Sequence, residues 1–248
     1  MVQSRAPTIF PSDGIANRLL ISLPKASLKR LQPSLELRVT ARGNVIKRVD
    51  RPVEHYYFVN RGLFSLVKTM KDGRSIEIGV IGIEGFTSPH TLFGLNKAAT
   101  DAIVQIPGEA FRIRRADLMR FMAEDAFLRN TLEKYAHFAH SAIAQTAACN
   151  RLHSLEARCC RWLLISHDSA RSDTFELTHE FLAMMLGVQR SGVSVAANFL
   201  QKSGLIRYLH GKMTITNRAG LEKATCECFA AMQKEYDDLI RAPQSAGA

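Results

Sequence analysis

The chain has 248 residues and a formal net charge of +10, with 33 lysines and arginines against 23 aspartates and glutamates. Hydrophobic residues make up 46% and charged residues 23%, a composition typical of a globular protein, which excludes disorder throughout. The apolar runs fall far short of the roughly 20 residues that a membrane-spanning helix needs, and Met1 to Ser12 lacks the apolar core of a secretory signal. We therefore expect a cytoplasmic protein with one large domain or two modest ones.

The first half of the chain, after a short helical lead-in, is predicted to be β structure. Turn signals recur about every ten residues from Arg42-Gly43-Asn44 to Glu84-Gly85, which is typical of a β sandwich or barrel. Ser75 to Val80 alternates polar or small residues with β-branched ones, as a half-buried strand should. Asp72-Gly73 predicts a hairpin between two such runs, because this pair tolerates the positive φ of a tight turn.

From Ala116 the hydrophobic period becomes that of a helix. Asp117 to Ala148 contains no glycine or proline, and a second helix is expected from Ser154 to Ser166. Apolar or small residues spaced alternately four and three apart indicate packing against a partner helix. We assign residues 126–150 to a dimerisation helix, with packing on the chain's own domain as the alternative. The predicted seam consists of Leu128, Leu132, Tyr135, Ala139, Ala142 and Thr146.

Leu177 to Ile206 predicts two short helices joined by a tight turn. Thr178 is suited to cap the first helix, because its oxygen can accept a free backbone N–H of the first turn. Gly187 can end that helix with a positive φ, and a second helix is expected from Gln189 to Lys202. Two strands after it, Leu205 to Tyr208 and Met213 to Thr216, would form a wing with His210-Gly211-Lys212 at its tip.

This order of elements is typical of a winged helix-turn-helix, whose second helix enters the DNA major groove. Arg190 can donate two hydrogen bonds to guanine, and Gln189 can pair with adenine. An ordinary two-helix hairpin is the alternative, but the stretch from Gln189 to Thr216 contains four cations and no acid, which favours a polyanionic partner. The candidate DNA-binding residues are Thr178, Gln189, Arg190, Ser191, Ser194, Lys202, His210 and Lys212.

Over roughly residues 14–217 these features resemble the Crp/Fnr, or catabolite-activator type, family of bacterial transcription regulators. The resemblance is strongest from Leu186 to Ser191 and at Gly204-Leu205-Ile206, and it extends to Cys149 to Ser154 and Arg161 to Leu164.

The resemblance implies an α+β fold in three parts. These are an N-terminal jelly roll of the cyclic-nucleotide-binding type (14–125), the dimerisation helix (126–150) and a winged helix-turn-helix domain with a C-terminal helix (151–240). It also implies a homodimer on a roughly palindromic operator in double-stranded DNA, controlled allosterically through the N-terminal domain, and it admits RNA polymerase as a further partner.

The sensor segment departs from the family's nucleotide-binding pattern, in which a Gly-Glu-Leu cassette is followed by an Arg-Ser pair that neutralises the cyclic phosphate. Here no acid follows a glycine between Phe86 and Gly94, no arginine is in place, and Pro89 removes a backbone donor. We therefore expect no ordinary cAMP binding. Ser191 also replaces the glutamate that often follows the recognition-helix arginine. The candidate effector-pocket residues are Phe86, Thr87, Ser88, His90, Lys97 and Thr100.

The five cysteines do not suggest a metal site. Cys159-Cys160 are adjacent, and Cys226 and Cys228 are one residue apart, whereas structural zinc sites usually have a two-residue gap. The first cysteine, Cys149, comes too late for the N-terminal iron–sulfur cluster that the family's oxygen sensors use. We expect reduced, packing cysteines, with no metal and no cofactor, and interpret His153 as a hinge or surface residue.

No catalytic constellation is present, so we do not expect an enzyme. Gly79, Gly82 and Gly85 lie in a strand region and are not a dinucleotide fingerprint, and His137 and His140 are interpreted as a pair on a helix surface. The competing hypothesis is a ligand- or redox-sensing module that acts mainly through protein partners. The tail from Asn217 to Ile240 is expected to be one helix packed on the DNA-binding domain.

Overall fold

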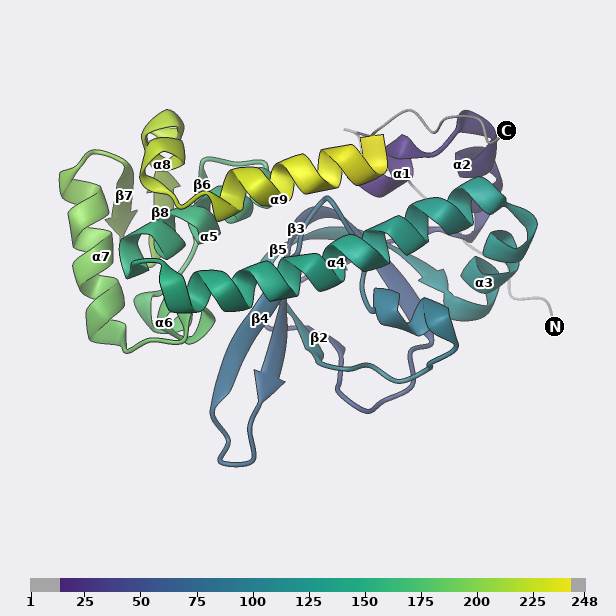
Figure 1. Ribbon diagram of the computed structural model, residues 1–248, viewed down its shortest axis with the longest axis horizontal. Helices are drawn as coiled ribbons and strands as arrows, with labels where there is room; N and C mark the ends of the chain where they lie inside the picture. Colours follow the sequence, from purple (N-terminus) through teal and green to yellow (C-terminus); the bar gives the residue numbers. More distant parts are fainter. Residues whose placement is uncertain (1–13, 242–248) are drawn as a thin grey trace.

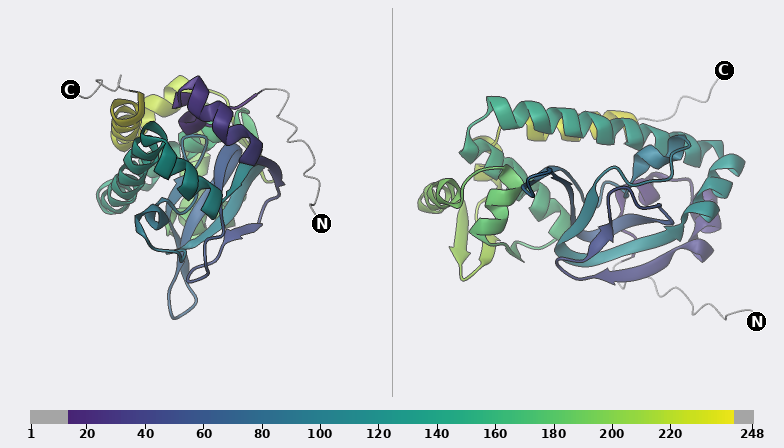
Figure 2. Two further views of the ribbon diagram at one scale, coloured as in Figure 1. Left: turned by 90° about the vertical axis from the view of Figure 1, so that its right-hand side faces the viewer. Right: turned by 90° about the horizontal axis from the view of Figure 1, so that it is seen from below.

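The structure is a computed structural model that describes residues 14–241. The expectation for Met1 to Ser12 therefore lies outside the described residues. Helix α4 runs along the long axis of the molecule, from an N-terminal β domain to a smaller C-terminal domain (Figure 1). Seen from below, the β sheet lies on one side of α4 and the C-terminal domain lies at its end (Figure 2). The predicted α+β fold class is confirmed. No helix of residues 14–241 is both long and apolar enough to cross a membrane.

The N-terminal domain is one antiparallel sheet of five strands, in the order β1-β5-β3-β4, with β2 also paired to β5. Two short helices and a 3-10 turn precede the sheet, and a second 3-10 turn, η2, lies between β4 and β5. The elements are α1 (Arg18–Ser22), α2 (Lys25–Leu31), η1 (Gln32–Ser34), β1 (Glu36–Thr40), β2 (Val45–Lys47), β3 (His55–Thr69), β4 (Ser75–Ile81), η2 (Pro89–Phe93) and β5 (Asp101–Arg114).

Two features of the sequence shape this sheet. The predicted hairpin joins β3 to β4, with Gly73 at a φ of 84°. Further along, β3 and β5 approach so closely that a Cβ added at Gly108 would lie 2.0 Å from the carbonyl oxygen of Arg61. A glycine is therefore required at this point, where the pairing of these two long strands shifts register.

The helical stretch predicted from Asp117 to Ala148 is interrupted at Asp125. It forms α3 (Arg115–Glu124) and α4 (Ala126–Leu152). Asp125 has extended backbone angles (φ −132°, ψ 99°), and its side chain accepts a hydrogen bond from the Leu128 N–H at 3.0 Å. An N-cap therefore starts a new helix there, although no glycine or proline marks the break.

The seam predicted on α4 faces the chain's own β domain. Leu128, Leu132 and Tyr135 are at most 2% exposed, and the Tyr135 ring lies 5.1 Å from that of Phe86. Ala139 and the remaining seam residues are half-buried. This face of α4 therefore packs on the chain's own β domain, which was the alternative to a dimer seam. A helix from a second copy would have to meet a different face of α4.

The C-terminal domain contains two helices around a tight turn and a three-stranded sheet in the order β6-β8-β7. A further helix, α5, precedes this pair. Its N-cap is Ser154, whose hydroxyl oxygen accepts from the Ala157 N–H at 3.3 Å. The elements are α5 (Leu155–Ala170), β6 (Thr174–Glu176), α6 (His179–Leu186), α7 (Arg190–Lys202), β7 (Ile206–Leu209), β8 (Lys212–Ile215), α8 (Arg218–Ala224), α9 (Cys228–Tyr236) and a final π-helical turn, η3 (Asp237–Arg241).

The tail differs from the single helix that the sequence predicted. It breaks between α8 and α9, and α9 runs back along α4 towards the β domain (Figure 1). The Tyr236 ring meets that of Phe138 edge-on at 5.2 Å, and the Tyr236 hydroxyl donates to the carbonyl oxygen of Glu84 at 3.0 Å. The last helix therefore does not pack on the DNA-binding domain alone. It links that domain to α4 and to the end of the β domain next to Glu84.

The β domain and the C-terminal domain share one core. Leu63 and Ile106 of the sheet belong to the same buried cluster as Trp162 of α5. The Trp162 indole N–H and the Ser65 hydroxyl both donate to the carboxyl group of Glu77, at 3.1 and 2.5 Å. The sensor sheet is thus in direct contact with the domain that carries the two-helix motif.

Candidate functional site

The helix pair α6–α7 has the geometry that the sequence predicted. Thr178 caps α6, because its hydroxyl oxygen accepts from the Phe181 N–H at 3.2 Å. Gly187 ends α6 with a φ of 64°, and α7 begins at Arg190 with Gln189 as its N-cap residue. One side of α7 is buried against the domain core through Val193, Ala196, Ala197 and Leu200.

The opposite side of α7 is open to solvent. Gln189, Arg190 and Ser191 are exposed at its N-terminus, where a helix-turn-helix meets base edges. Val195 is 67% exposed, and Asn198 is also exposed one turn further along. These two residues were not among the candidates from the sequence, although their spacing from Ser191 on one helical face could have revealed them.

Ser194 is held by the protein itself. Its hydroxyl donates to the carbonyl oxygen of Arg190 and lies 3.1 Å from Nδ1 of His179. The His179 ring stacks on Tyr208 of β7, with ring centroids 4.2 Å apart. Burial, helped by the nearby charge of Arg190, lowers the pKa of His179. Ser194 therefore joins α7 to the wing through a histidine that the sequence analysis did not single out.

The wing is a tight hairpin of β7 and β8. His210 and Gly211 both have positive φ, 47° and 76°, as a two-residue turn of this kind requires. The carbonyl oxygen of Gly211 accepts from the Leu177 N–H at 2.8 Å, which holds the wing tip beside the start of α6. His210 and Lys212 are exposed there, close in the fold to Thr178.

The basic residues of this region are available to a partner. The side chains of Arg190, Lys202, Arg207 and Lys212 are exposed, and none forms an ion pair with another described residue. The structure therefore brings the predicted DNA-binding candidates to one end of the molecule, with Ser194 as the exception that is already hydrogen-bonded internally.

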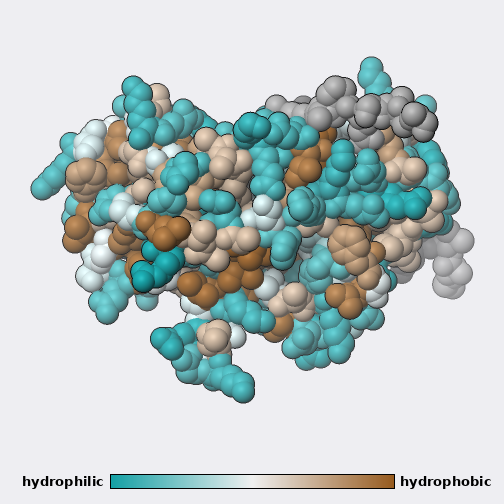
Figure 3. Space-filling view, in the orientation of Figure 1, coloured by the Kyte–Doolittle hydropathy of each residue, from teal (hydrophilic) through white to brown (hydrophobic). Residues whose placement is uncertain are grey.

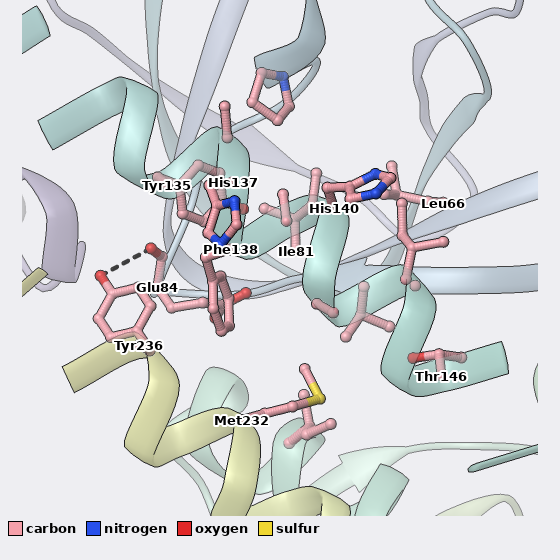
Figure 4. Close-up of a pocket in the computed structure, with 18 of the residues that line it drawn as sticks. Leu66, Ile81, Glu84, Tyr135, His137, Phe138, His140, Thr146, Met232 and Tyr236 are labelled. Atoms are coloured by element: carbon pink, nitrogen blue, oxygen red, sulfur yellow. Dashed lines mark hydrogen bonds between the residues drawn. The ribbon is translucent and has the colours of Figure 1, made fainter. Parts of the chain in front are cut away.

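A cavity of about 770 Å³ lies between the sheet, α4 and α9 (Figure 4). This volume suits a small molecule. Its walls are largely apolar, with Leu66 and Ile81 from the sheet, Phe138 from α4 and Met232 from α9. In the space-filling view, hydrophobic side chains gather where α4 crosses β4 (Figure 3).

The cavity also contains a buried carboxyl group. Burial raises the pKa of Glu77 to about 8, against the opposing effects of the hydrogen bonds from Ser65 and Trp162. Glu77 is therefore predominantly protonated at neutral pH. It lies where the cavity wall meets the C-terminal domain.

The helix pair α6–α7 and the sheet that forms one wall of the cavity lie in regions that match known protein families. The chain matches the Crp-like helix-turn-helix domain over residues 157–224 and the cyclic nucleotide-binding domain over residues 37–125. The chain belongs to the Crp/Fnr family of transcription regulators. It is accordingly a DNA-binding transcription regulator with an N-terminal sensing domain, in a family that is not enzymatic, and the resemblance drawn from the sequence is confirmed.

Solved structures of Crp/Fnr proteins share its fold. FixK2 from Bradyrhizobium japonicum is 17% identical, with a TM-score of 0.63 over 77% of this chain and 98% of that one. A CRP-family regulator from Thermus thermophilus is 20% identical, with a TM-score of 0.61 over 75% and 95%. The c-di-GMP responsive global regulator CLP of Xanthomonas campestris is 16% identical, with a TM-score of 0.59 over 77% and 99%. No curated protein matches the chain by sequence.

The sensing domain of this Crp/Fnr protein brings together only half of the predicted effector residues. Ser88, His90 and Thr100 line the cavity. Phe86 and Thr87 do not, because both are fully buried: Phe86 stacks on Phe58, and the Thr87 hydroxyl accepts from the Tyr57 N–H. Lys97 is exposed and lies off the cavity wall.

The two histidines expected on a helix surface lie on one, and they also border the cavity. His137 and His140 of α4 are exposed and line the opening (Figure 4). The arginines on the wall are Arg18 and Arg161, and Arg18 is paired with Asp237 at 2.7 Å. Two serines, Ser88 and Ser169, line the same cavity as these arginines.

Proposed function

We propose that this Crp/Fnr regulator acts as a homodimer that inserts one α7 helix per protomer into the major groove of a roughly palindromic operator. The observation that carries the proposal is the open, acid-free face of α7, with Gln189 and Arg190 exposed at its N-terminus. In a helix-turn-helix, this end of the second helix meets base edges.

Several exposed side chains of this region have suitable partners in DNA. Arg190 would donate two hydrogen bonds to guanine, and Gln189 or Asn198 would pair with adenine. Val195 would contact a thymine methyl group. Thr178, Lys202, His210 and Lys212 would contact phosphates and set the register without reading sequence.

The dimer would form through the outward face of α4. Exposed residues on that face alternate at spacings of four and three, and two of the six are alanines, which permit close approach of a second helix. The hydrophobic area where α4 crosses β4 in Figure 3 is open in the single chain, and a second copy would cover it. The proposed seam is Glu133, His137, His140, Ala144, Ala147 and Arg151.

The 770 Å³ cavity would hold the effector, and its apolar walls favour a ligand other than a cyclic nucleotide. A ligand there would touch the sheet, α4 and α9 together, and could thereby bias the orientation of the DNA-binding domain. In this proposal residues 14–125 sense the ligand, 126–150 dimerise and 151–240 bind DNA. RNA polymerase is the partner through which a bound dimer would act on transcription.

The test is Arg190→Ala, assayed by gel shift on an operator selected from random duplexes. We expect the preference for the operator to disappear, while weak binding that falls steeply with salt remains. Arg48→Ala is the matched control, because Arg48 is an exposed arginine of the β domain outside this face. An Arg190→Ala protein that keeps the wild-type sequence preference would refute the assignment of α7.

A further inference from the structure

Four residues that are distant in the sequence meet where α4, α5 and α9 come together. Cys149 lies in the last turn of α4, and His153 is the C-cap residue of that helix. Cys226 lies between α8 and α9, and Cys228 is the first residue of α9. Their side chains offer three sulfur atoms and one ring nitrogen, all within 4.8 Å of one another.

The separations fit the ligands of a single tetrahedral ion. Cys149 Sγ lies 3.6 Å from Cys226 Sγ, and Cys228 Sγ lies 3.5 Å from His153 Nδ1. With Zn–S bonds of about 2.3 Å and Zn–N bonds of about 2.0–2.1 Å, tetrahedral geometry places two sulfurs about 3.8 Å apart and a sulfur and a nitrogen about 3.6 Å apart. These two separations match those values, and since all four ligand atoms lie within 4.8 Å of one another, shifts of about 1 Å or less would bring the whole Cys₃His set to tetrahedral spacing.

The histidine is oriented as a metal ligand would be. Its Nδ1 faces the cysteines, and its Nε2 lies 3.1 Å from the carboxylate of Glu227. A carboxylate that accepts from the outer N–H of a ligating histidine fixes the tautomer and directs the other nitrogen's lone pair at the metal. Gln145 adds a second outer contact, because its amide donates to Cys228 Sγ at 3.0 Å.

The buried positive charge beside the cluster also favours a bound metal ion. Arg158 and Arg161 are 8% and 7% exposed, and neither forms an ion pair with a described residue. Both interact electrostatically with Cys149. A divalent ion with three thiolates and a neutral imidazole carries one net negative charge, which would offset part of this buried positive charge.

We propose that Cys149, His153, Cys226 and Cys228 bind one Zn²⁺ ion. Soft thiolates with one imidazole in a closed four-ligand set are typical of structural zinc sites. From the sequence, the cysteines were expected to pack in the core without a metal. That expectation rested on the short spacings of Cys159-Cys160 and of Cys226 and Cys228. A Cys149–Cys226 disulfide would leave the orientation of Cys228 and the His153–Glu227 contact unexplained, whereas an ion accounts for all four residues.

The position of the ion suggests what it would do. His153 and Ser154 form the hinge between α4 and α5, and Cys226 and Cys228 belong to the segment that turns α9 back along α4. One ion would therefore fasten the hinge of the DNA-binding domain to the long helix. Metal binding itself does not depend on the proposed mode of DNA recognition, so each can fail without the other.

The first measurement is metal content of the full chain, purified under reducing conditions without chelator. We expect one zinc per chain, and cobalt substituted for it should give thiolate charge-transfer and tetrahedral d–d absorption bands. Cys228→Ala should lose the metal. Cys159→Ala should keep one zinc per chain, because Cys159 is equally buried but lies outside the cluster.

Glu227→Gln is a second variant that does not perturb the core, since the Glu227 side chain is 76% exposed. In competition with a chromophoric chelator, its zinc affinity should fall about 10–100-fold relative to wild type. A purely structural role for the His153–Glu227 contact would leave that affinity unchanged.

Any one of four results would overturn the proposal. The first is wild-type protein without metal that gives no cobalt bands on titration after full reduction. The second is a Cys149–Cys226 disulfide in the purified protein, with no metal uptake once it is reduced. The third is iron in place of zinc at one equivalent per chain. Equal zinc retention by Cys228→Ala and Cys159→Ala would also contradict it.

Discussion

At the residue scale, Glu77 shows how one buried group can report on the contact between the two domains. It accepts hydrogen bonds from Ser65 in the sheet and from Trp162 in α5. Burial raises the pKa of Glu77 from 4.5 to about 8. Deprotonation would therefore place a negative charge in the shared core, where the nearby Arg161 offsets only part of the desolvation cost.

This shift predicts a specific dependence of stability on pH. Between pH 4.5 and about 8 the folded state keeps a proton on Glu77 that the unfolded chain has lost. The folded state then binds more protons, so the free energy of unfolding falls as pH rises, by up to about 1.4 kcal/mol per pH unit for one group. Glu77→Gln should flatten this part of the profile, which denaturant titrations at pH 5, 6, 7 and 8 would show. Parallel profiles for the two proteins would contradict the assignment.

At the scale of elements, the sequence predicted best where signals are local. Thr178 and Gly187 fix the ends of α6 through hydrogen bonds and a positive φ that belong to those residues themselves. The hairpin at Asp72-Gly73 was predicted for the same reason. The helix assigned to residues 126–150 starts where α4 does, but no local signal marks the break before it, because Asp125 is an ordinary helix residue unless its side chain caps the following turn.

The sequence predicted less where a side chain's role depends on which distant part of the fold it contacts. The alternation of apolar residues correctly marked one face of α4, but periodicity does not say whether that face meets a second copy or the chain's own sheet. Leu132 and Tyr135 meet the sheet. The cysteine cluster was hidden for a related reason, because Cys149 and Cys226 are 77 residues apart and only the return of α9 brings them together.

The packing of α4 on the sheet depends on a missing side chain at Gly85. A Cβ there would lie 1.8 Å from the Tyr135 hydroxyl oxygen and 2.2 Å from the ring carbon that carries it. Gly85→Ala should therefore lower the free energy of unfolding by about 1–3 kcal/mol, as overpacking does in other cores. Circular dichroism during urea titration would measure the change.

Gly79→Ala is the control for this substitution. The nearest atom to its added Cβ is Cγ1 of Ile143 at 3.5 Å, an ordinary contact. We expect stability within about 0.5 kcal/mol of wild type, or slightly higher. If both substitutions lowered the free energy of unfolding equally, the close approach of Tyr135 would not be the reason for the loss at Gly85.

At the scale of the whole molecule, contacts at several places hold the domains together. The sheet and α5 share a core around Trp162, α9 returns along α4, and the cysteine cluster lies at the hinge between α4 and α5. The effector cavity touches the sheet, α4 and α9. A change at the cavity can therefore reach the domain that carries α7 through packed elements.

The central claim is that two copies of this chain present α7 to successive major grooves on one side of a duplex. Hydroxyl-radical footprinting of the full chain on an operator selected from random DNA tests it most directly. We predict an inverted repeat with two symmetric protected regions on one face of the duplex, about 34 Å apart. A single asymmetric half-site, or protection without a selected repeat, would contradict the account.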